Sequence, residues 1–443
     1  MLPMVALAGI LAIALMLWRP VTGLVLFGLV APLGMTQLPF SLDVVTVMSA
    51  LVVALAAWEV LLSRHSLLPA STASIAASLW SLGIVASVAF SAEPGRAAVL
   101  GTWQILAAWT AIAVGFLART PSRLSATLAA VLAGAIVVAL TGLRQGLSTQ
   151  GAFNGTVVEG RATGIFSQPN EYGLYCAMVW SFSLALACLS RGYIRWLAII
   201  CAVASLGGLA ASFSRASWTG ALLAAVVMAF LIPQTRRPQA IGLATIIGLL
   251  GIALVAVPYW NLPSLLVSRL TSIVGGQSNP YDNRPALMAE GVREWGQNVW
   301  LGIGPNMYPI ESRTLQSPTR TLEGQHAHNL VLTIGAEQGL VGLLAVGLFA
   351  AAVISAFRGA RRVAVLDAAP QRCPLGAAVS LSATAALVAL LGAGIVDYPL
   401  RNAMTRATMW LLVGLTLAGQ RCLTAQPRAA ARHSSTDAQA STA

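Results

Sequence analysis

Long, nearly charge-free apolar runs alternate with short polar stretches along almost the whole chain. A run of about 18 or more apolar residues is long enough to cross a bilayer as a helix. The runs predict thirteen spans, or twelve if the two short runs at the start form one span and a re-entrant piece. They cover residues 2–18, 20–33, 44–62, 73–91, 98–117, 124–143, 172–189, 194–211, 217–232, 239–259, 329–357, 376–396 and 402–418. The pattern therefore predicts an all-α integral membrane protein with 12–13 transmembrane helices.

The spacing of the apolar runs divides the chain into four parts. Residues 1–259 carry the first ten predicted helices with mostly short outer loops, and residues 329–420 carry the C-terminal helices. Between them, residues 260–328 form one large loop, long enough to fold as a small domain. Residues 421–443 are small and polar, so we predict a disordered cytoplasmic tail.

Composition agrees with a membrane protein and changes the meaning of the charge. Hydrophobic residues make up 57% of the 443 residues and charged residues only 9%, with a mean hydropathy of +0.78. A soluble chain carries about 25% charged residues. The net charge of +12 comes from arginines that flank the apolar runs, as basic residues do at a membrane surface. No nucleic-acid-binding module is visible, and we expect no nucleic-acid partner.

The arginines also predict which loops face the cytoplasm, because basic residues concentrate in the short cytoplasmic loops of membrane proteins. Counting the predicted spans places six arginine-bearing loops or ends on one side. They contain Arg64, Arg119 and Arg123, Arg191 and Arg195, Arg236 and Arg237, Arg358 to Arg372, and Arg421 to Arg432. The opposite loops are then periplasmic, and they are residues 34–43, 92–97, 144–171, 212–216, 260–328 and 397–401.

Three arginines of the predicted periplasmic side lie in distinctive settings. Arg161 begins a glycine-containing segment, and glycine permits close approach of the backbone to a ligand. Arg215 lies in a tight turn between two predicted spans, and Arg401 follows Asp397 at the entry to another. Arginine binds phosphate oxygens in a bidentate manner and stays charged, so three at one membrane level suit a diphosphate. A solvated or headgroup-paired arginine is the alternative for each one taken alone.

A histidine motif, His326-Ala-His328-Asn329, ends the large loop and leads into a predicted span. At about 100° per residue, Gly335, Gly339 and Gly342 fall within about 40° of the helix face that carries His328. Such a glycine stripe lets a neighbouring helix pack closely, which predicts His328 at the mouth of a helix bundle. A polar anchor at the membrane interface is the alternative. No further ligand accompanies the two histidines at a metal-site spacing, so we expect no metal.

Three motifs together resemble the O-antigen ligase and polymerase superfamily of bacterial envelope glycosyltransferases. The first is His328-Asn329 followed by Glu337-x-Gly339-x-x-Gly342. The second is Arg284 with the later motif Trp-Leu-Gly-Ile-Gly-Pro-Asn-Met-Tyr at residues 300–308. The third is Arg-Ala-Thr-Gly-Ile-Phe-Ser-Gln-Pro-Asn at residues 161–170. The hydropathy profile is similar along nearly the whole chain, including the large late loop.

The resemblance implies a membrane-embedded, C-type glycosyltransferase of the bacterial inner membrane with its active site facing the periplasm. Its donor would be a glycan on undecaprenyl diphosphate. In the ligases the acceptor is the lipid A–core oligosaccharide of lipopolysaccharide, and in the polymerases it is another carrier-linked repeat unit. Membrane lipids surround the protein, and neither a cofactor nor a nucleotide sugar is implied.

The chemistry of such a transfer fits the same residues. A departing diphosphate needs positive charge, which preorganised cations supply. The acceptor hydroxyl needs a base, and histidine titrates near working pH. We therefore assign His328 as the base and Arg161, Arg215 and Arg401 as diphosphate-binding residues. Second-rank or supporting candidates are Arg284, His326, Asn329, Glu337 and Gly339. Direct attack by the acceptor would invert the anomeric centre.

These motifs are shared across several functions. An O-antigen ligase is our first expectation, and a polymerase of O-antigen, capsule or exopolysaccharide repeats is the second. A protein O-oligosaccharyltransferase fits Gln168-Pro169-Asn170, but the chain shows no large C-terminal periplasmic domain. A non-enzymatic transporter of lipid-linked glycans is a different class. Transporters usually show internal repeats and mid-membrane ionisable residues, and neither is evident in this sequence.

Overall fold

The computed structural model describes residues 16–31, 43–63, 71–147, 161–232, 237–256, 283–311, 316–317, 320–321, 326–366 and 375–440. The helices are α2 (Pro20–Val30), α3 (Val44–Ser63), α4 (Thr72–Ala89), α5 (Pro94–Leu117), α6 (Pro121–Leu147), α7 (Pro169–Leu189), α8 (Gly192–Ser212), α9 (Arg215–Leu231), α10 (Arg237–Ala256), α12 (Arg284–Gln297), α13 (Tyr308–Glu311), α14 (Leu330–Leu366), α15 (Leu375–Gly394), the 3-10 helix η5 (Pro399–Arg401) and α16 (Ala403–Ala440). Two short strands, β1 (Gln316–Ser317) and β2 (Arg320–Thr321), pair antiparallel. Helix dominates the described residues.

The helices confirm the predicted membrane fold. Within the described residues, eight are long and apolar enough to cross a membrane, and three shorter apolar helices lie at Pro20–Val30, Arg215–Phe230 and Pro238–Leu250. Every predicted span from residues 20–33 onward contains a helix. The first predicted span, residues 2–18, lies almost wholly outside the described residues. The chain is thus an all-α, multi-pass integral membrane protein.

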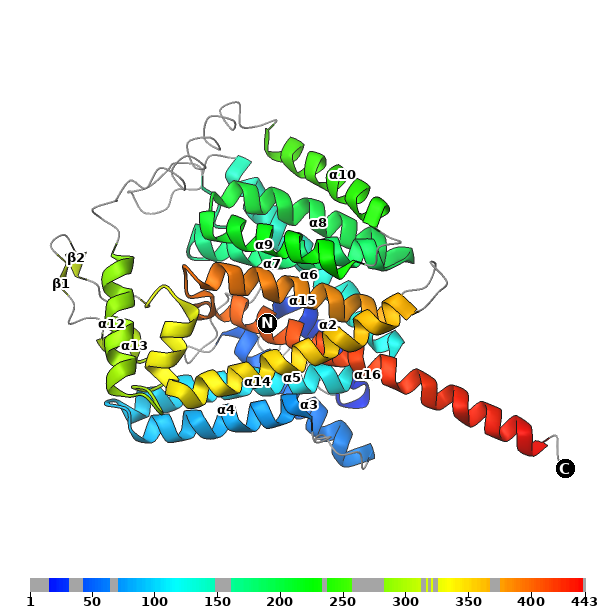
Figure 1. Ribbon diagram of the computed structural model, residues 1–443, viewed down its shortest axis with the longest axis horizontal. Helices are drawn as coiled ribbons and strands as arrows, with labels where there is room; N and C mark the ends of the chain where they lie inside the picture. Colours follow the sequence, from blue (N-terminus) through cyan, green and yellow to red (C-terminus); the bar gives the residue numbers. More distant parts are fainter. Residues whose placement is uncertain are drawn as a thin grey trace, which may run out of the picture.

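The last helix, α16, extends into the segment for which the sequence predicts a disordered tail. Helix α16 continues past the predicted boundary at residue 420 to Ala440, and its last part projects away from the bundle (Figure 1). Alanine, arginine and glutamine recur in this segment and favour helix. The low hydrophobicity of this segment is the reason that the sequence predicts disorder. Low hydrophobicity does not prevent a helix from continuing when its first half is already packed in the bundle.

Two groups of helices pack on either side of α15 and α16 (Figure 1). Helices α7, α8 and α9 form one group with α6 and α10, and helices α3, α4 and α5 pack with α14 in the other. Helix α15 contacts α7 and α9 on one side and α14 and α16 on the other. Segments far apart in sequence therefore meet at the centre of the molecule.

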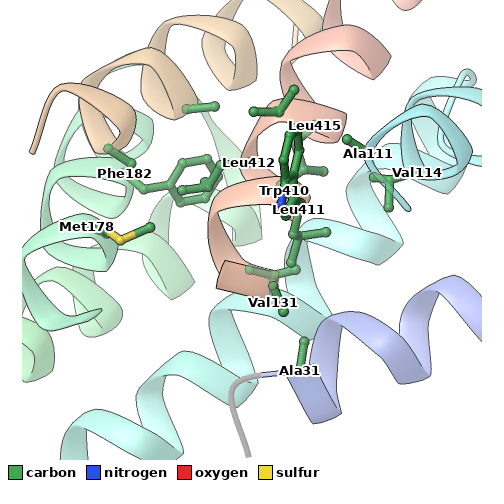
Figure 2. Packing of buried hydrophobic residues seen from close by; sticks show 14 of the residues in the cluster. Ala31, Ala111, Val114, Val131, Met178, Phe182, Trp410, Leu411, Leu412 and Leu415 are labelled. Carbon is green, nitrogen blue, oxygen red and sulfur yellow. The ribbon is translucent and has the colours of Figure 1, made fainter. Parts of the chain in front are cut away.

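The apolar core is built around the first half of α16. Figure 2 shows its side chains between those of α7 and α5. The labelled buried residues are Ala31, Ala111, Val114, Val131, Met178, Phe182, Trp410, Leu411, Leu412 and Leu415. Trp410 also meets the ring of Phe349 from α14 edge-on, with centroids 4.7 Å apart. This packing fixes the entry of α16, where Arg401 lies.

Small residues let these helices approach closely, as is common between membrane helices. A Cβ added to Gly220 of α9 would lie 2.3 Å from the carbonyl oxygen of Ala389 on α15. Likewise, a Cβ on Gly376 of α15 would lie 2.5 Å from the carbonyl oxygen of Gly419 on α16. The backbones at these crossings leave no room for a larger side chain.

The two ends of the bundle differ in chemistry. At one end Glu59 accepts hydrogen bonds from Arg119 and Arg123, at 2.9 and 2.8 Å. These residues belong to the side predicted to be cytoplasmic. The other end brings together the C-terminal ends of α8 and α15 and the N-terminal ends of α7, α14 and α16, through contacts described below. This is the end that we predicted to face the periplasm.

Candidate functional site

His328 lies immediately before α14, in a backbone conformation that Asn329 helps to fix. The φ of His328 is +49°, in the left-handed region. The side-chain oxygen of Asn329 accepts a hydrogen bond from the Leu332 amide (3.0 Å), which caps the first turn of α14. Its side-chain nitrogen donates to the carbonyl of Ile395 (2.9 Å), just after α15. Asn329 therefore holds the histidine against the loop that joins α15 to α16.

That loop supplies Asp397 as the partner of His328. The Nδ1 atom of His328 lies 3.1 Å from Oδ1 of Asp397, and the amide of Tyr398 donates to the same oxygen at 2.8 Å. Burial alone would raise the pKa of Asp397, but the hydrogen bond from His328 and the charge of Arg401 lower it to about 2. Asp397 is thus a carboxylate that accepts the Nδ1 proton. With Nδ1 bound to Asp397, Nε2 is the ring nitrogen of His328 that can face a substrate.

The role of Asp397 is not visible in the sequence, where this residue stands out only as part of the segment before Arg401. The available signal was a carboxylate at a helix entry on the same predicted side as the histidine motif, in a chain with only 14 acidic residues. The pairing spans 69 residues of sequence, so no local spacing reveals it.

His326 is placed differently from His328. It is buried, its ring centroid lies 4.8 Å from that of Tyr398, and its Nδ1 atom has no hydrogen-bond partner among the described residues. Burial, followed by the charges of Arg401 and His328, lowers the pKa of His326 to about 3, although Asp397 opposes the shift. His326 is therefore neutral at physiological pH and supports the site as an uncharged ring.

Arg401 connects this cluster to the start of α7. Its Nε donates to Glu171 (3.0 Å) and its Nη2 to the side-chain oxygen of Gln168 (2.5 Å). The second oxygen of Glu171 accepts from Ser167 (2.7 Å) and Asn402 (3.1 Å). The Arg401 side chain is only 17% exposed, and its charge acts on both His326 and Asp397. Arg401 is thus a fixed cation beside the His328–Asp397 pair.

Arg161 lies across the same end of α7. Its Nε donates to the carbonyl of Ser212 at the end of α8 (2.9 Å), and its Nη2 donates to the side-chain oxygen of Asn170 (2.8 Å). Asn170 is the residue next to Glu171, so Arg161 and Arg401 bind neighbouring residues of α7. Two nitrogens of Arg161 hold the protein together, a structural role that the sequence did not indicate.

The segment that carries Arg161 is fastened by Gln145 of α6. The side-chain oxygen of Gln145 accepts from the amide and the hydroxyl of Thr163 (2.9 and 3.1 Å) and from the amide of Gly164 (2.8 Å). Gly164 has a φ of +58°, which glycine adopts at no steric cost. The glycine of the predicted motif is therefore required by this turn.

Arg215 and Arg284 each begin a helix. Arg215 is the exposed first residue of α9, two residues after Phe213, whose φ of +48° makes the tight turn. Positive charge at a helix N-terminus adds to the helix dipole and favours an anion nearby. Arg284 is the half-buried first residue of α12, which packs against α14 through Leu287. The tight turn at Phe213 separates Arg215 from Ser212, whose carbonyl accepts the hydrogen bond from Arg161.

The predicted glycine stripe below His328 is wrong. His328 precedes the helix with a positive φ, and Gly339 breaks α14 with φ +61° and ψ −159°. The glycines on either side of the break therefore do not continue one helical face. A Cβ on Gly339 would lie 2.3 Å from the backbone of Trp300, and one on Gly335 would lie 2.7 Å from the ring of Trp295. Gly339 admits a backbone segment, not a neighbouring helix.

That segment joins two of the motifs into one structural unit. The amides of Ile303 and Gly304 donate to the carbonyls of Ala336 and Glu337 (2.8 and 3.0 Å). After the break, the amide of Leu340 donates to the carbonyl of Val299 (2.8 Å). These bonds replace those that an unbroken helix would make.

The Glu337 side chain also fastens this segment. Its Oε2 accepts from the Asn306 amide at 2.9 Å, while its backbone carbonyl accepts from the hydroxyl of Ser87 on α4 at 3.1 Å. Gly302 makes room for the contact, because a Cβ there would lie 2.3 Å from the Glu337 backbone. Glu337 and Gly339 thus hold this segment against α14, through a geometry that the sequence did not predict.

Part of the chain is similar to a known protein family. Residues 200–347 match the family model described as O-Antigen ligase. This match covers about a third of the chain, and it supports a likeness to the O-antigen ligase and polymerase superfamily. The matched segment contains Arg215, Arg284, His328 and Glu337, whereas Asp397 and the other site arginines lie outside it. No curated protein matches the chain. Members of the superfamily are glycosyltransferase-like enzymes of lipid-linked glycans.

Proposed function

We propose that this protein is an O-antigen ligase of the bacterial inner membrane. It transfers a glycan from undecaprenyl diphosphate to the lipid A–core oligosaccharide on the periplasmic face. The observation that carries the proposal is the His328–Asp397 pair beside the fixed cation Arg401, all at one end of a membrane helix bundle. A base and a cation at one membrane level are what transfer from a lipid diphosphate requires.

The base activates the acceptor. The Nε2 atom of His328 removes the proton of an acceptor hydroxyl as that oxygen forms a bond to the anomeric carbon. Asp397 accepts the Nδ1 proton, so it orients the ring and stabilises the imidazolium that forms. The attack from the face opposite the diphosphate inverts the anomeric centre.

The cations stabilise the leaving group. As the bond between the anomeric carbon and the diphosphate oxygen breaks, the electron pair stays with undecaprenyl diphosphate. In this proposal Arg401 and Arg215 neutralise this charge, which is supported by the Nη1 atom of Arg401, since it makes no hydrogen bond with the described residues. Glu171 and Gln168 hold the guanidinium in place, which makes it a preorganised cation. The transfer uses only protein groups.

Deletion of the gene, followed by electrophoresis of the surface polysaccharide, tests the proposal. We expect loss of all capped lipopolysaccharide, with carrier-linked polymer retained. The wild-type gene should restore capping, and His328→Ala should not, although the protein accumulates normally in the membrane. Lipopolysaccharide capped with a single repeat unit would instead identify a polymerase. Unchanged lipopolysaccharide with loss of another surface glycan would exclude the proposed ligase acceptor.

A further inference from the structure

The end of the bundle opposite His328 contains an open groove between α14 and α16. It has a volume of about 540 Å³ and is lined by one face of α14 with Gln420 of α16 on the other side. In Figure 1 the C-terminal half of α14 runs towards the side of the bundle from which α16 projects. Sites that enclose small molecules have volumes of roughly 300–1,000 Å³. The groove is therefore large enough for a lipid headgroup with its glycerol backbone.

Small residues give the groove its depth. Ala351, Ser355 and Gly359 line it and are spaced four residues apart, so they lie on one face of α14. A Cβ added to Gly359 would meet no atom within 4 Å. The space above this glycine is open, in contrast to Gly376 and Gly419, where the backbones of α15 and α16 already touch.

Two arginines line the groove at its outer end. Arg358 and Arg362 are also four residues apart, and both are exposed. Among the described residues, no carboxylate pairs with either of them, whereas Glu59 pairs with Arg119 and Arg123 at the same end of the bundle. Two guanidinium groups on one groove, with no acidic partner in the part of the chain that the structure describes, can together bind an anion.

The opposite end of the groove is apolar. Ile354 lines it with 46% of its surface exposed. It lies one helical turn deeper in the span than Arg358, about 6 Å at 1.5 Å per residue. The cationic rim and the apolar wall thus lie in the same order as the phosphate and the acyl chains of a lipid in a bilayer.

We propose that this groove binds an anionic phospholipid, with Arg358 and Arg362 on the phosphate and Ile354 against the upper acyl chain. Inorganic phosphate would satisfy the arginines and leave the apolar wall uncovered. A lipid seated between α14 and α16 bridges the helix that begins at His328 and the helix that follows Arg401. The site is independent of the proposed transfer reaction and of the acceptor.

Native mass spectrometry of the purified full chain in detergent tests the site. Phosphatidylglycerol and phosphatidylcholine are titrated in parallel, and inorganic phosphate is added as a competitor. We expect phosphatidylglycerol to bind about tenfold or more tightly than phosphatidylcholine, as two charge-assisted contacts would give. Millimolar phosphate should not displace it. Displacement by phosphate would show that the groove binds a free anion and not a lipid, which would contradict the proposal. Equal binding of both lipids would also overturn it.

Two variants and a matched control separate the groove from general surface charge. Gly359→Leu fills the groove while every charge is kept, and it should abolish preferential phosphatidylglycerol binding with unchanged elution and melting temperature. The double variant Arg358→Gln/Arg362→Gln should reduce it at least tenfold. Arg361→Gln removes an exposed arginine of the same helix that does not line the groove, and it should have little effect. Equal losses for Arg361→Gln, or full binding by Gly359→Leu, would contradict the assignment.

Discussion

At the scale of single residues, the charges of Asp397 and His326 follow from burial and from the charged groups beside them. Asp397 is held as a carboxylate, with its pKa lowered to about 2, while His326 is held neutral, with its pKa lowered to about 3. Arg401 contributes to both shifts, since a cation stabilises an anion and opposes a second cation. Of the two histidines, His328 is the one whose ring nitrogen has a carboxylate partner, at 3.1 Å.

Replacement of Asp397 tests this arrangement directly. Asp397→Asn keeps the shape but removes the charge and offers an amide that can hold the ring in the wrong tautomer. We expect transfer to fall roughly 10²–10⁴-fold while donor binding is retained. The measurement uses purified protein, a carrier-linked donor and an acceptor. Glu93→Gln, an exposed carboxylate at the same end of the bundle, should be silent. Comparable activities for both variants would contradict the pairing.

The buried neutral state of His326 predicts a pH-dependent stability. Its folded-state pKa of about 3 lies below the ordinary value of 6.5. As pH falls below about 6.5, the unfolded chain takes up a proton that the folded chain refuses, so the folded state loses stability. The loss is on the order of 1 kcal/mol per pH unit.

His326→Gln removes this proton uptake. Thermal melting in detergent should therefore show a smaller decrease between pH 7 and pH 5 for His326→Gln than for the wild type. Because His328 is unchanged in the variant, a glycan-transfer assay at pH 7 should retain much of the activity. Melting temperatures that decrease in parallel for both proteins would show that His326 is protonated in the folded state.

At the scale of elements, the break in α14 is the feature on which the site depends. Gly339 takes a φ and ψ that almost only glycine adopts, at a cost of about 1–3 kcal/mol for other residues. Its position against the Trp300 backbone leaves no space for a Cβ. The break lets the segment that ends at Tyr308 bond to both halves of the helix.

Gly339→Ala should therefore lower the melting temperature and reduce transfer. The matched control is Gly347→Ala, in the same helix, where a Cβ meets nothing within 4 Å. Alanine is the better helix former by about 1 kcal/mol, so this control should be neutral or stabilising. Both variants are compared by size-exclusion after heating and by the transfer assay. A stable, active Gly339→Ala protein would show that α14 can run unbroken.

The extent to which sequence predicted these elements follows from the range of the interactions. Helices in lipid are specified by local hydrophobicity, so the spans from α2 to α16 were predictable. Asn329 as a helix cap is likewise a local signal. The break at Gly339 depends on backbone bonds to a segment more than 30 residues earlier in the chain. A helical wheel assumes continuity and therefore could not show it.

The site residues divide in the same way. The arginine and histidine motifs that the sequence singles out lie at one end of the bundle. The hydrogen-bond partners of these residues could not be predicted from the sequence, because they are distant along the chain. Arg161 bonds to Ser212 across 51 residues, and Arg401 bonds to Glu171 across 230 residues. Burial decided the roles of the two histidines, and the sequence gives no measure of burial for residues only two positions apart.

At the scale of the whole molecule, the His328–Asp397 pair and the Glu59–arginine cluster lie at opposite ends of the helix bundle. The end of the bundle with His328 carries the proposed transfer site. The end with Glu59 carries Arg119 and Arg123, which pair with Glu59. The arginine distribution predicts that the second end is cytoplasmic. Orientation therefore decides whether the donor and acceptor can reach the site.

Cysteine labelling of intact cells with a permeabilised outer membrane tests the orientation. Gly95 is exposed at the start of α5, next to the segment around Ser91 that packs against Gly304, and Ser122 is exposed between Arg119 and Arg123. In a chain whose five native cysteines are replaced, a membrane-impermeant maleimide should label Gly95→Cys. Ser122→Cys should be labelled only after the inner membrane is disrupted. The reverse pattern would place His328, Asp397 and Arg401 in the cytoplasm, away from any periplasmic acceptor, and the proposed ligase reaction would have to be abandoned.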